Sequence, residues 1–150
     1  MRITRHQMFM QIAEVVARRS TCYRRNVGAV LVRNNTIVSH GYNGPPSGEP
    51  HCTGTTCPTN NVCTRALHAE INAINRYDGP YSALTLYVTE SPCMACAARI
   101  VDDLRIHSTY YMHPYRDPAG VNYLANNIPV FRMTLAGDII DHTTGEFVIT

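Results

Sequence analysis

Residues 83–112 read ALTLYVTESPCMACAARIVDDLRIHSTYYM. The segment 83–88 has the apolar and β-branched character of a buried strand, and residues 109–112 predict another strand. Between them Pro92 opens a helix that extends to about Leu104, because proline is favoured in the first turn of a helix. A strand, a helix and a strand in direct succession predict a parallel pair of strands joined by a helical crossover.

The residues before this unit predict a helix followed by an antiparallel hairpin. The helix covers residues 5–19, and strands at 27–32 and 36–40 are joined by a turn at Asn34 and Asn35. The other predicted elements are a helix at 64–77, a short helix at 120–127, a strand near Val130 and a hairpin around Gly137 and Gly145. A hairpin beside a parallel pair predicts an α/β fold with a mixed sheet.

The bulk composition predicts one domain over residues 1–150. The chain is 45% hydrophobic and 16% charged, and it contains no repeat and no boundary between domains. All of its basic side chains are arginine, which excludes Schiff-base chemistry on lysine. The formal net charge of +2 is too small to predict a nucleic-acid partner.

The sequence also predicts a cytoplasmic protein without a membrane partner. It has no long apolar run and no apolar stretch typical of a signal peptide. Four arginines near the N-terminus, at positions 2, 5, 18 and 19, leave an organellar transit peptide as the alternative. Glu14 and the apolar spacing of Phe9, Ile12 and Ala13 favour a packed amphipathic helix instead.

The six cysteines of the chain indicate metal binding, because a protein without a secretion signal keeps its thiols reduced. Cys93 and Cys96 are three residues apart on the helix that Pro92 opens, so they project from one face. In the first helical turn, the positive end of the helix dipole favours the thiolate that binds metal. The pair is therefore predicted to supply two ligands of a metal site.

His68 and Glu70 complete the predicted site. They are two residues apart, which places them on different sides of a regular helix, so both can serve one site only if the helix begins near His68. Catalytic zinc takes three protein ligands and leaves a position for water. His68, Cys93 and Cys96 supply these ligands, and Glu70 is predicted to be the catalytic group that moves protons.

The combination H-x-E…P-C-x-x-C is the known signature of zinc nucleobase deaminases, whereas either half alone is common by chance. Further stretches carry a closer resemblance: STCYR at 20–24, VGAV at 27–30, GYNG at 41–44, HC at 51–52, HAEINAI at 68–74, YVT at 87–89, PCMAC at 92–96, and Tyr110, Tyr111 and Tyr115. The chain resembles the deoxycytidylate (dCMP) deaminase family, of the phage and bacterial type, within the cytidine deaminase-like superfamily. The resemblance extends to about Asp117.

This resemblance implies a three-layer fold with a mixed five-stranded sheet flanked by helices. It implies zinc-dependent hydrolysis of dCMP to dUMP and ammonia, which supplies dUMP for thymidylate synthesis. A homo-oligomer, often a hexamer, is typical of the family. So is regulation by dCTP and dTTP, with Mg accompanying the nucleotide effector, at a site that the loop 41–48 is expected to form.

The remaining four cysteines, Cys22, Cys52, Cys57 and Cys63, predict a second, structural zinc. Buried free thiols are the alternative, since free cysteine behaves as a small apolar residue. Three of the four lie in a polar segment rich in Gly, Pro, Thr and Asn, and four sulfur ligands close a structural site. Some relatives in the resembled family carry such a second zinc. His51 is an alternative ligand.

The resemblance assigns four residues to substrate binding: Arg24, Asn43, Ala69 and Tyr115. Arg24 matches a phosphate ligand, for which Arg25 and Arg116 are alternatives. Asn43 matches a contact near the base or sugar, and its alternative is a turn residue with a positive φ. Tyr115 is predicted to lie beside the base or phosphate, or else in the core.

Competing functions remain open from the residues alone. The rival enzymes are deaminases of dCTP or modified dCMP, of free cytidine, of tRNA adenosine and of a riboflavin precursor. The four-cysteine cluster argues against the last three. A zinc-stabilised binding module without turnover is the rival from another class, and Glu70 argues against it, since a structural site needs no proton-transfer group.

Overall fold

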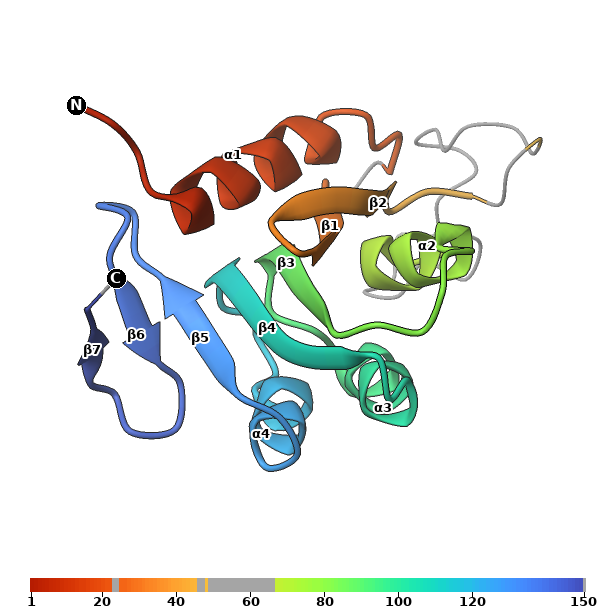
Figure 1. Cartoon of the computed structure of the whole chain (residues 1–150). Coiled ribbons are helices and arrows are strands. Elements are labelled where there is room, and N and C mark those ends of the chain that lie inside the picture. The colour runs from red at the N-terminus through yellow and green to blue at the C-terminus, as the bar shows by residue number, and fades with distance from the viewer. Residues whose placement is uncertain (23–24, 46–47, 49–66, 150) are drawn as a thin grey trace.

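A computed structural model describes residues 1–22, 25–45, 48 and 67–149. These residues form one sheet with the strand order β2-β1-β3-β4-β5-β6-β7 (Figure 1). The strands are β1 Gly28–Arg33, β2 Thr36–Tyr42, β3 Leu84–Glu90, β4 Ile106–His113, β5 Val130–Met133, β6 Ile139–Asp141 and β7 Phe147–Val148. The helices are α1 Arg5–Ala17, α2 Ala69–Arg76, α3 Met94–Asp102 and α4 Ala119–Ala125.

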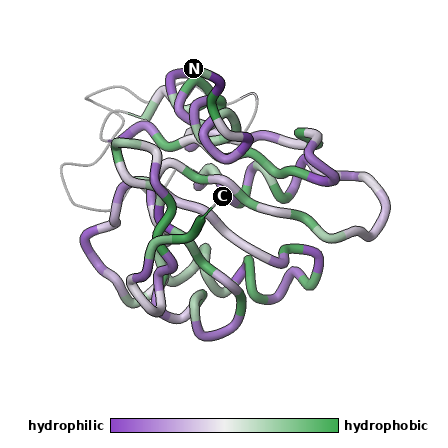
Figure 2. Tube along the Cα trace, turned by 60° about the vertical axis from the view of Figure 1, so that its left-hand side comes forward, coloured by the Kyte–Doolittle hydropathy of each residue, from purple (hydrophilic) through white to green (hydrophobic). Residues whose placement is uncertain are grey.

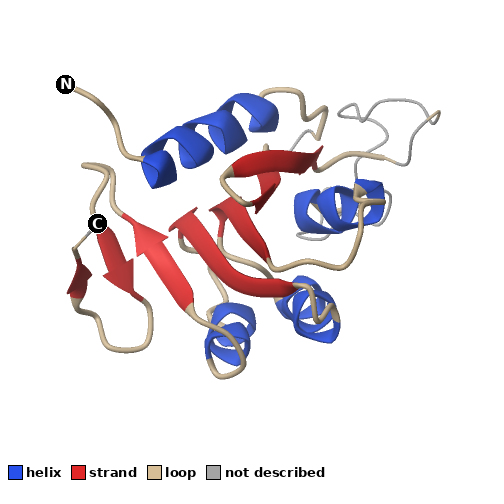
Figure 3. Ribbon diagram, in the orientation of Figure 1, coloured by secondary structure: helices blue, strands red, loops and turns tan. Residues whose placement is uncertain are grey.

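The sheet is covered by helices on both faces, as the ribbon in Figure 3 shows. Helix α1 lies on one face, while α2, α3 and α4 lie on the other (Figure 1). Strand β1 shows why two layers of helix are needed: Ala29 and Leu31 pack toward α2, and Val30 and Val32 pack toward α1. A strand buried on both faces reads as a continuous apolar run, which is what GAVLV supplies.

The predicted mixed sheet is confirmed. Strands β1 and β2 pair antiparallel, and β3, β4 and β5 pair parallel to one another. The predicted number of five strands is too small, because the hairpin of β6 and β7 pairs antiparallel with the β5 edge and brings the sheet to seven strands. The resemblance stopped at about Asp117, so it had no information on these two short strands.

Two predicted helix starts need correction. The helix assigned to 64–77 begins at Ala69, since Leu67 pairs instead with Gly44 as an isolated bridge and His68 is the N-cap. That start agrees with the separate expectation of a helix beginning near His68. The helix assigned to Pro92 begins at Met94, with Cys93 as its N-cap. In both cases the metal-ligand candidate stands at the helix boundary.

The start of α1 and the β1–β2 turn form where the sequence predicts them, and each is stabilised by residues close in the sequence. Thr4 accepts a hydrogen bond from the backbone N–H of Gln7, and the Gln7 side chain accepts one from the Thr4 N–H, which forms a capping box for α1. The β1–β2 turn is made by Asn34 and Asn35, with φ of 50° and 60°. Asparagine tolerates this left-handed backbone, so the Asn-Asn pair fits a tight hairpin turn.

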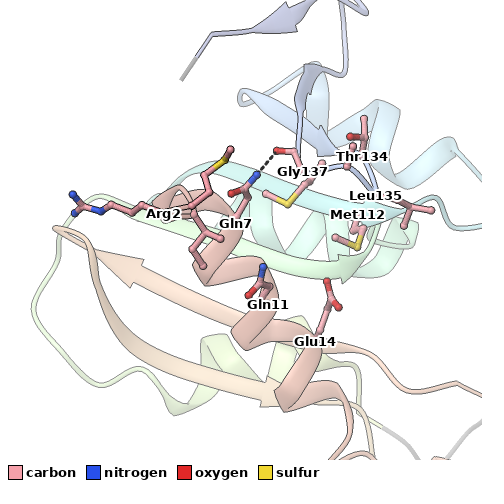
Figure 4. Close-up of a pocket in the computed structure, with 12 residues that line it drawn as sticks. Arg2, Gln7, Gln11, Glu14, Met112, Thr134, Leu135 and Gly137 are labelled. Atoms are coloured by element: carbon pink, nitrogen blue, oxygen red, sulfur yellow. Dashed lines mark hydrogen bonds between the residues drawn. The ribbon is translucent and has the colours of Figure 1, made fainter.

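The surface away from the sheet's helical layers has two features. A hollow lies between the N-terminal segment, α1 and the turn from β5 to β6, where Gln7 donates a hydrogen bond of 3.3 Å to the carbonyl oxygen of Gly137 (Figure 4). The second feature is the C-terminal segment, which is hydrophobic (Figure 2) and in which Phe147 and Ile149 are exposed. None of the predicted site residues that the structure describes lines the hollow. In the part of the chain described here, no helix has the length and apolarity needed to cross a membrane.

Candidate active site

Three side chains converge between α2 and α3. One ligand atom each from His68, Cys93 and Cys96 lies within 4.8 Å of the others. The His68 Nδ1 atom is 3.0 Å from the Cys96 sulfur and 3.4 Å from the Cys93 sulfur. His68 is exposed, Cys93 is half-buried and Cys96 is buried. The cluster is therefore open to solvent on one side and closed on the other.

The two helix starts explain this convergence. His68 is the N-cap of α2 and Cys93 is the N-cap of α3, while Cys96 lies in the first turn of α3. Residues at helix starts have backbone N–H groups without intrahelical partners and face the positive end of the helix dipole. The predicted first-turn position is confirmed for Cys96, whereas Cys93 lies one position before the first turn, as the N-cap.

Two glycines permit the close packing around these helix starts. A Cβ atom on Gly41 would lie 2.5 Å from the carbonyl oxygen of Ala69, against the first turn of α2. A Cβ atom on Gly120 would lie 2.5 Å from the carbonyl oxygen of Pro92 and would also meet the carbonyl carbon of Cys93. Both obstacles are backbone atoms. Strand β2 and helix α4 can approach the ligand-bearing segments only without a side chain at these positions.

Replacing Gly120 with Ala is therefore expected to weaken metal binding as well as the fold. The new methyl group must push α4 or the Cys93 backbone aside, and such overpacking costs about 1–3 kcal/mol of unfolding free energy. Thermal unfolding and zinc titration against a competing chelator would measure both effects. Ala119→Ser, an exposed change on the same helix, is the control. Zinc affinity equal to that of the unsubstituted protein would show that Gly120 does not position Cys93.

Hydrogen bonds within the cluster shift its proton affinities. The pKa of Cys93 falls to about 4, chiefly because Cys96 donates a hydrogen bond to it, with His68 as a further donor. The pKa of Cys96 rises, first because of that same hydrogen bond and then because of burial. The pKa of His68 is raised by its hydrogen bond to Cys93. The metal-free cluster thus holds one ready thiolate and releases protons when a metal binds.

Glu70 lies in the first turn of α2 and is 4% exposed. Burial raises the pKa of its carboxyl to about 7, against the lowering effects of its own backbone N–H and the charge of His68. A group with a pKa near the working pH can both accept and donate a proton, which is the property required of a general acid and base. A buried carboxyl beside the cluster is suited to that task.

The donor set fits zinc. Catalytic zinc sites use three nitrogen and sulfur ligands and keep one position open. For tetrahedral zinc the nitrogen-to-sulfur separation is about 3.6 Å. The separations of 3.0 and 3.4 Å need only small side-chain movements to reach it. His68 is the exposed member of the three.

Asn43 is buried, and its side chain forms hydrogen bonds with backbone groups. Its side-chain oxygen accepts a hydrogen bond of 2.8 Å from the Val27 N–H, and its amide donates one of 2.7 Å to the Arg25 carbonyl oxygen. Its φ is not positive, so the alternative of a left-handed turn residue is wrong. Asn43 instead ties the end of β2 to the segment that precedes β1.

The structure describes some of the other predicted site residues but not all of them. Ala69 is buried as the first residue of α2, and Tyr115 follows β4 with its N–H donating a 2.6 Å hydrogen bond to the Ser91 hydroxyl. Cys22 is half-buried, and its N–H donates to the Ser20 hydroxyl. The predictions for Arg24, His51, Cys52, Cys57 and Cys63 fall outside the described residues.

Sequence reasoning missed three contributors to this region. Gly41 and Gly120 were not distinguished from other glycines, since a close approach of two backbones leaves no local pattern. Glu90 was not singled out, although it stands three residues before Cys93 at the end of β3. In the structure Glu90 pairs with Arg25 at 3.0 Å. The position of Glu90 directly before the Ser91-Pro92-Cys93 segment was the available signal.

Comparisons with known proteins agree with this geometry. The family profile described as the cytidine and deoxycytidylate deaminase zinc-binding region matches residues 3–113. ComE operon protein 2 of Bacillus subtilis is 37% identical over an alignment of 119 residues that covers 77% of this chain and 62% of that protein. Deoxycytidylate deaminase of Mycobacterium phage D29 is 39% identical over an alignment of 106 residues that covers 61% of this chain and 81% of that protein.

Solved structures show the same fold. The crystal structure of dCMP deaminase from the cyanophage S-TIM5, in complex with dCMP and dUMP, superposes with a TM-score of 0.76 and 31% identity. The match covers 85% of this chain and 95% of the cyanophage chain. Relative to ComE operon protein 2, this chain spans less than two thirds of the length.

Proposed function

The chain belongs to the cytidine and deoxycytidylate deaminase family, and from that premise we propose that it hydrolyses dCMP to dUMP and ammonia with zinc, supplying dUMP for thymidylate synthesis. The observation that carries the proposal is the buried Glu70 carboxyl, which lies two residues after His68 in the first turn of α2 and close enough to Cys96 to raise the pKa of that thiol. A structural metal site has no use for such a carboxyl. The similarity to the phage enzymes supports the choice of dCMP.

Each residue of the cluster has a distinct task in this proposal. His68, Cys93 and Cys96 hold the zinc, which supplies an activated water at neutral pH when bound. Glu70 takes a proton from the attacking water and delivers it to the ring nitrogen of cytosine. It then takes the second proton from the hydroxyl group added at the cytosine C4 carbon and gives it to the amino group, so that the C4–N bond breaks, ammonia leaves and a carbonyl group remains. The pKa of Glu70, raised to about 7 by burial, suits this two-way transfer.

The proposal extends to parts of the protein outside the cluster. Residues 1–150 act as one deaminase domain, because a single sheet runs through strands β1 to β7. Cys22, Cys52, Cys57 and Cys63 hold a structural zinc, and Ala69 contributes its first-turn N–H to the substrate site. The assembly is a homo-oligomer, as family membership suggests. Asn43 supports the substrate site through the backbone of Arg25.

An ammonia-release panel tests the proposal. Purified protein with measured zinc content would be given dCMP, CMP, dCTP and cytidine, and dCMP is expected to react fastest. A faster reaction with dCTP than with dCMP would identify dCTP as the substrate. No release of ammonia from any of the compounds would favour a binding module without turnover. Repeating the dCMP reaction with dCTP, dTTP and Mg²⁺ tests regulation, and identical rate curves would reject it.

A further inference from the structure

The C-terminal hairpin carries a histidine that contacts two other elements at once. His142 directly follows β6. Its Nδ1 atom is 2.8 Å from the hydroxyl oxygen of Tyr111 in β4, and its Nε2 atom is 2.9 Å from the Oδ1 atom of Asn122 in α4. The His142 backbone N–H donates a further hydrogen bond of 2.9 Å to the Val130 carbonyl oxygen in β5. The imidazole therefore connects the hairpin both to the sheet and to a helix.

The chemistry of the two partners sets the direction of the imidazole hydrogen bonds. Asn122 Oδ1 can only accept, so the His142 Nε2 atom carries the hydrogen and Nδ1 accepts from the Tyr111 hydroxyl. Burial lowers the pKa of His142, against a raising effect of Asp141, and burial raises the pKa of Tyr111. Both shifts favour the neutral imidazole and the protonated phenol that this arrangement requires.

Helix α4 is held from two sides. Its buried side is packed into the core by Val121 and Leu124, which are 3% and 0% exposed. On its exposed side lies Asn122. Among the described residues, the bond from Asn122 to His142 is the side-chain hydrogen bond that joins α4 to another element. A helix of seven residues has little stability of its own, so such contacts decide where it lies.

The first turn of α4 packs against the backbone of a metal-ligand candidate. A Cβ atom on Gly120 would lie 2.5 Å from the Pro92 carbonyl oxygen and 2.7 Å from the Cys93 carbonyl oxygen. With α4 in place, Cys93 therefore has no room to move toward it. Asn122 lies two residues after Gly120 and within the same turn of helix. A contact that fixes Asn122 thus also fixes the surface on which Cys93 rests.

Resting on the proposed function and its zinc, we infer that His142 is a positioning residue of the metal site, which holds α4 against the Cys93 backbone through the hydrogen bond from Nε2 to Asn122. The C-terminal hairpin is then part of the unit that binds the catalytic zinc. His142 lies outside residues 3–113, the range that the family profile matches. Outer contacts of this kind act by fixing the orientation of a ligand.

Two substitutions of His142 separate its two side-chain hydrogen bonds. In His142→Gln the amide nitrogen can replace Nε2 and keep the bond to Asn122, whereas His142→Asn keeps only a group near Nδ1. His142→Asn is expected to weaken zinc binding about 3- to 10-fold, less than the roughly 10- to 100-fold of partners that touch a ligand directly. His142→Gln should bind zinc nearly as the unsubstituted protein does. Titration against a chelator measures both, and Cys96→Ser titrated in parallel defines the signal of any other zinc site.

Asn122→Ala removes the same hydrogen bond from the side of α4. It should match His142→Asn, and the double variant should bind zinc no more weakly than either single variant, because both remove one interaction. Ammonia release from dCMP at limiting zinc should fall by the same factor and recover in excess zinc. That recovery is the signature of a residue that acts through the metal ligand, and its absence would contradict the inference.

Two controls separate this role from general stability. Thr143→Ala changes an exposed neighbour of His142 and should leave zinc affinity unchanged. Ile139→Val shortens a buried side chain that packs with α1 on the other face of the sheet. It should lower the midpoint of thermal unfolding, since a small cavity is left in the core, without changing zinc affinity.

Zinc affinity separates this inference from the proposed function. Unchanged affinity in both His142→Asn and Asn122→Ala rejects the inference, as does an equal loss in His142→Gln or in Ile139→Val. If the unsubstituted protein releases no ammonia but the zinc effects are present, the function alone is rejected. An unsubstituted protein that binds no zinc at the cluster rejects both. If His142→Asn does not fold, Asn122→Ala decides the outcome, because it changes an exposed side chain.

Discussion

Glu70→Gln is expected to lower kcat for dCMP by about 1,000-fold or more while zinc remains bound, since general acid–base groups contribute about 10²–10⁴-fold and Glu70 serves several proton transfers. Glutamine has nearly the same shape as glutamate but cannot exchange a proton. Ammonia release measures the rate, and metal analysis of the same sample measures zinc. The unchanged metal content is essential, because it separates proton transfer from loss of the site.

The stability of the metal-free variant supplies an independent check. Burial raises the Glu70 pKa from 4.5 to about 7, so the folded state binds this proton more tightly than the unfolded state. The unfolding free energy of the unsubstituted protein therefore falls as pH rises through this interval, and Glu70→Gln removes that fall. Glu14→Gln, an exposed change on α1, is the matched control and should leave the rate intact. Retention of a tenth of the activity in Glu70→Gln would contradict the assigned role.

Cys96→Ser is expected to abolish both turnover and binding of the catalytic zinc. Cys96 is 1% exposed, and its sulfur lies 3.0 Å from His68 Nδ1. The serine hydroxyl is a poor replacement for a thiolate as a zinc ligand. Loss of a mere outer partner costs about 10–100-fold in metal affinity, so loss of a direct ligand should cost more than 100-fold. Zinc titration against a chelator and ammonia release measure the two effects.

Zinc stoichiometry makes the same experiment a test of the second site. The unsubstituted protein should carry both zinc ions, and Cys96→Ser should lose the catalytic one alone. Cys57→Ser should lose the structural one and lower thermal stability, because a structural zinc contributes directly to folding. Asp102→Asn, an exposed change at the end of α3, is the control for Cys96→Ser and should keep both metals. A single zinc in the unsubstituted protein would reject the structural site.

The fold was largely predictable where the chain carries strong local signals. Apolar runs defined β1 and β3, the Asn34-Asn35 pair defined the hairpin turn, and the strand–helix–strand unit predicted the parallel part of the sheet. The start of α2 was misplaced where helix propensity was applied to residues 64–77. The bridge between Leu67 and Gly44 decides that boundary, and these residues are far apart in the sequence.

Asn43 and Arg25 show what the sequence could not predict about the site. The GYNG motif pointed to Asn43, but motif matching could not show that its amide is occupied by the backbone of Val27 and Arg25. Arg25 and Arg24 are neighbours of the same type, so sequence reasoning could not separate their roles. The structure shows that Arg25 pairs with Glu90, and this ion pair joins positions that are 65 residues apart.

The sequence alone predicted which groups would hold a metal and move protons beside it. His68 with Glu70, and Cys93 with Cys96, are defined by spacings of two and three residues at helix starts, and such local geometry depends little on the rest of the chain. Only the tertiary structure decided that these helix starts meet, that Gly41 and Gly120 let their neighbours approach, and that Glu90 pairs with Arg25. These contacts join distant segments through the order of strands in the sheet, and no short stretch of sequence encodes that order.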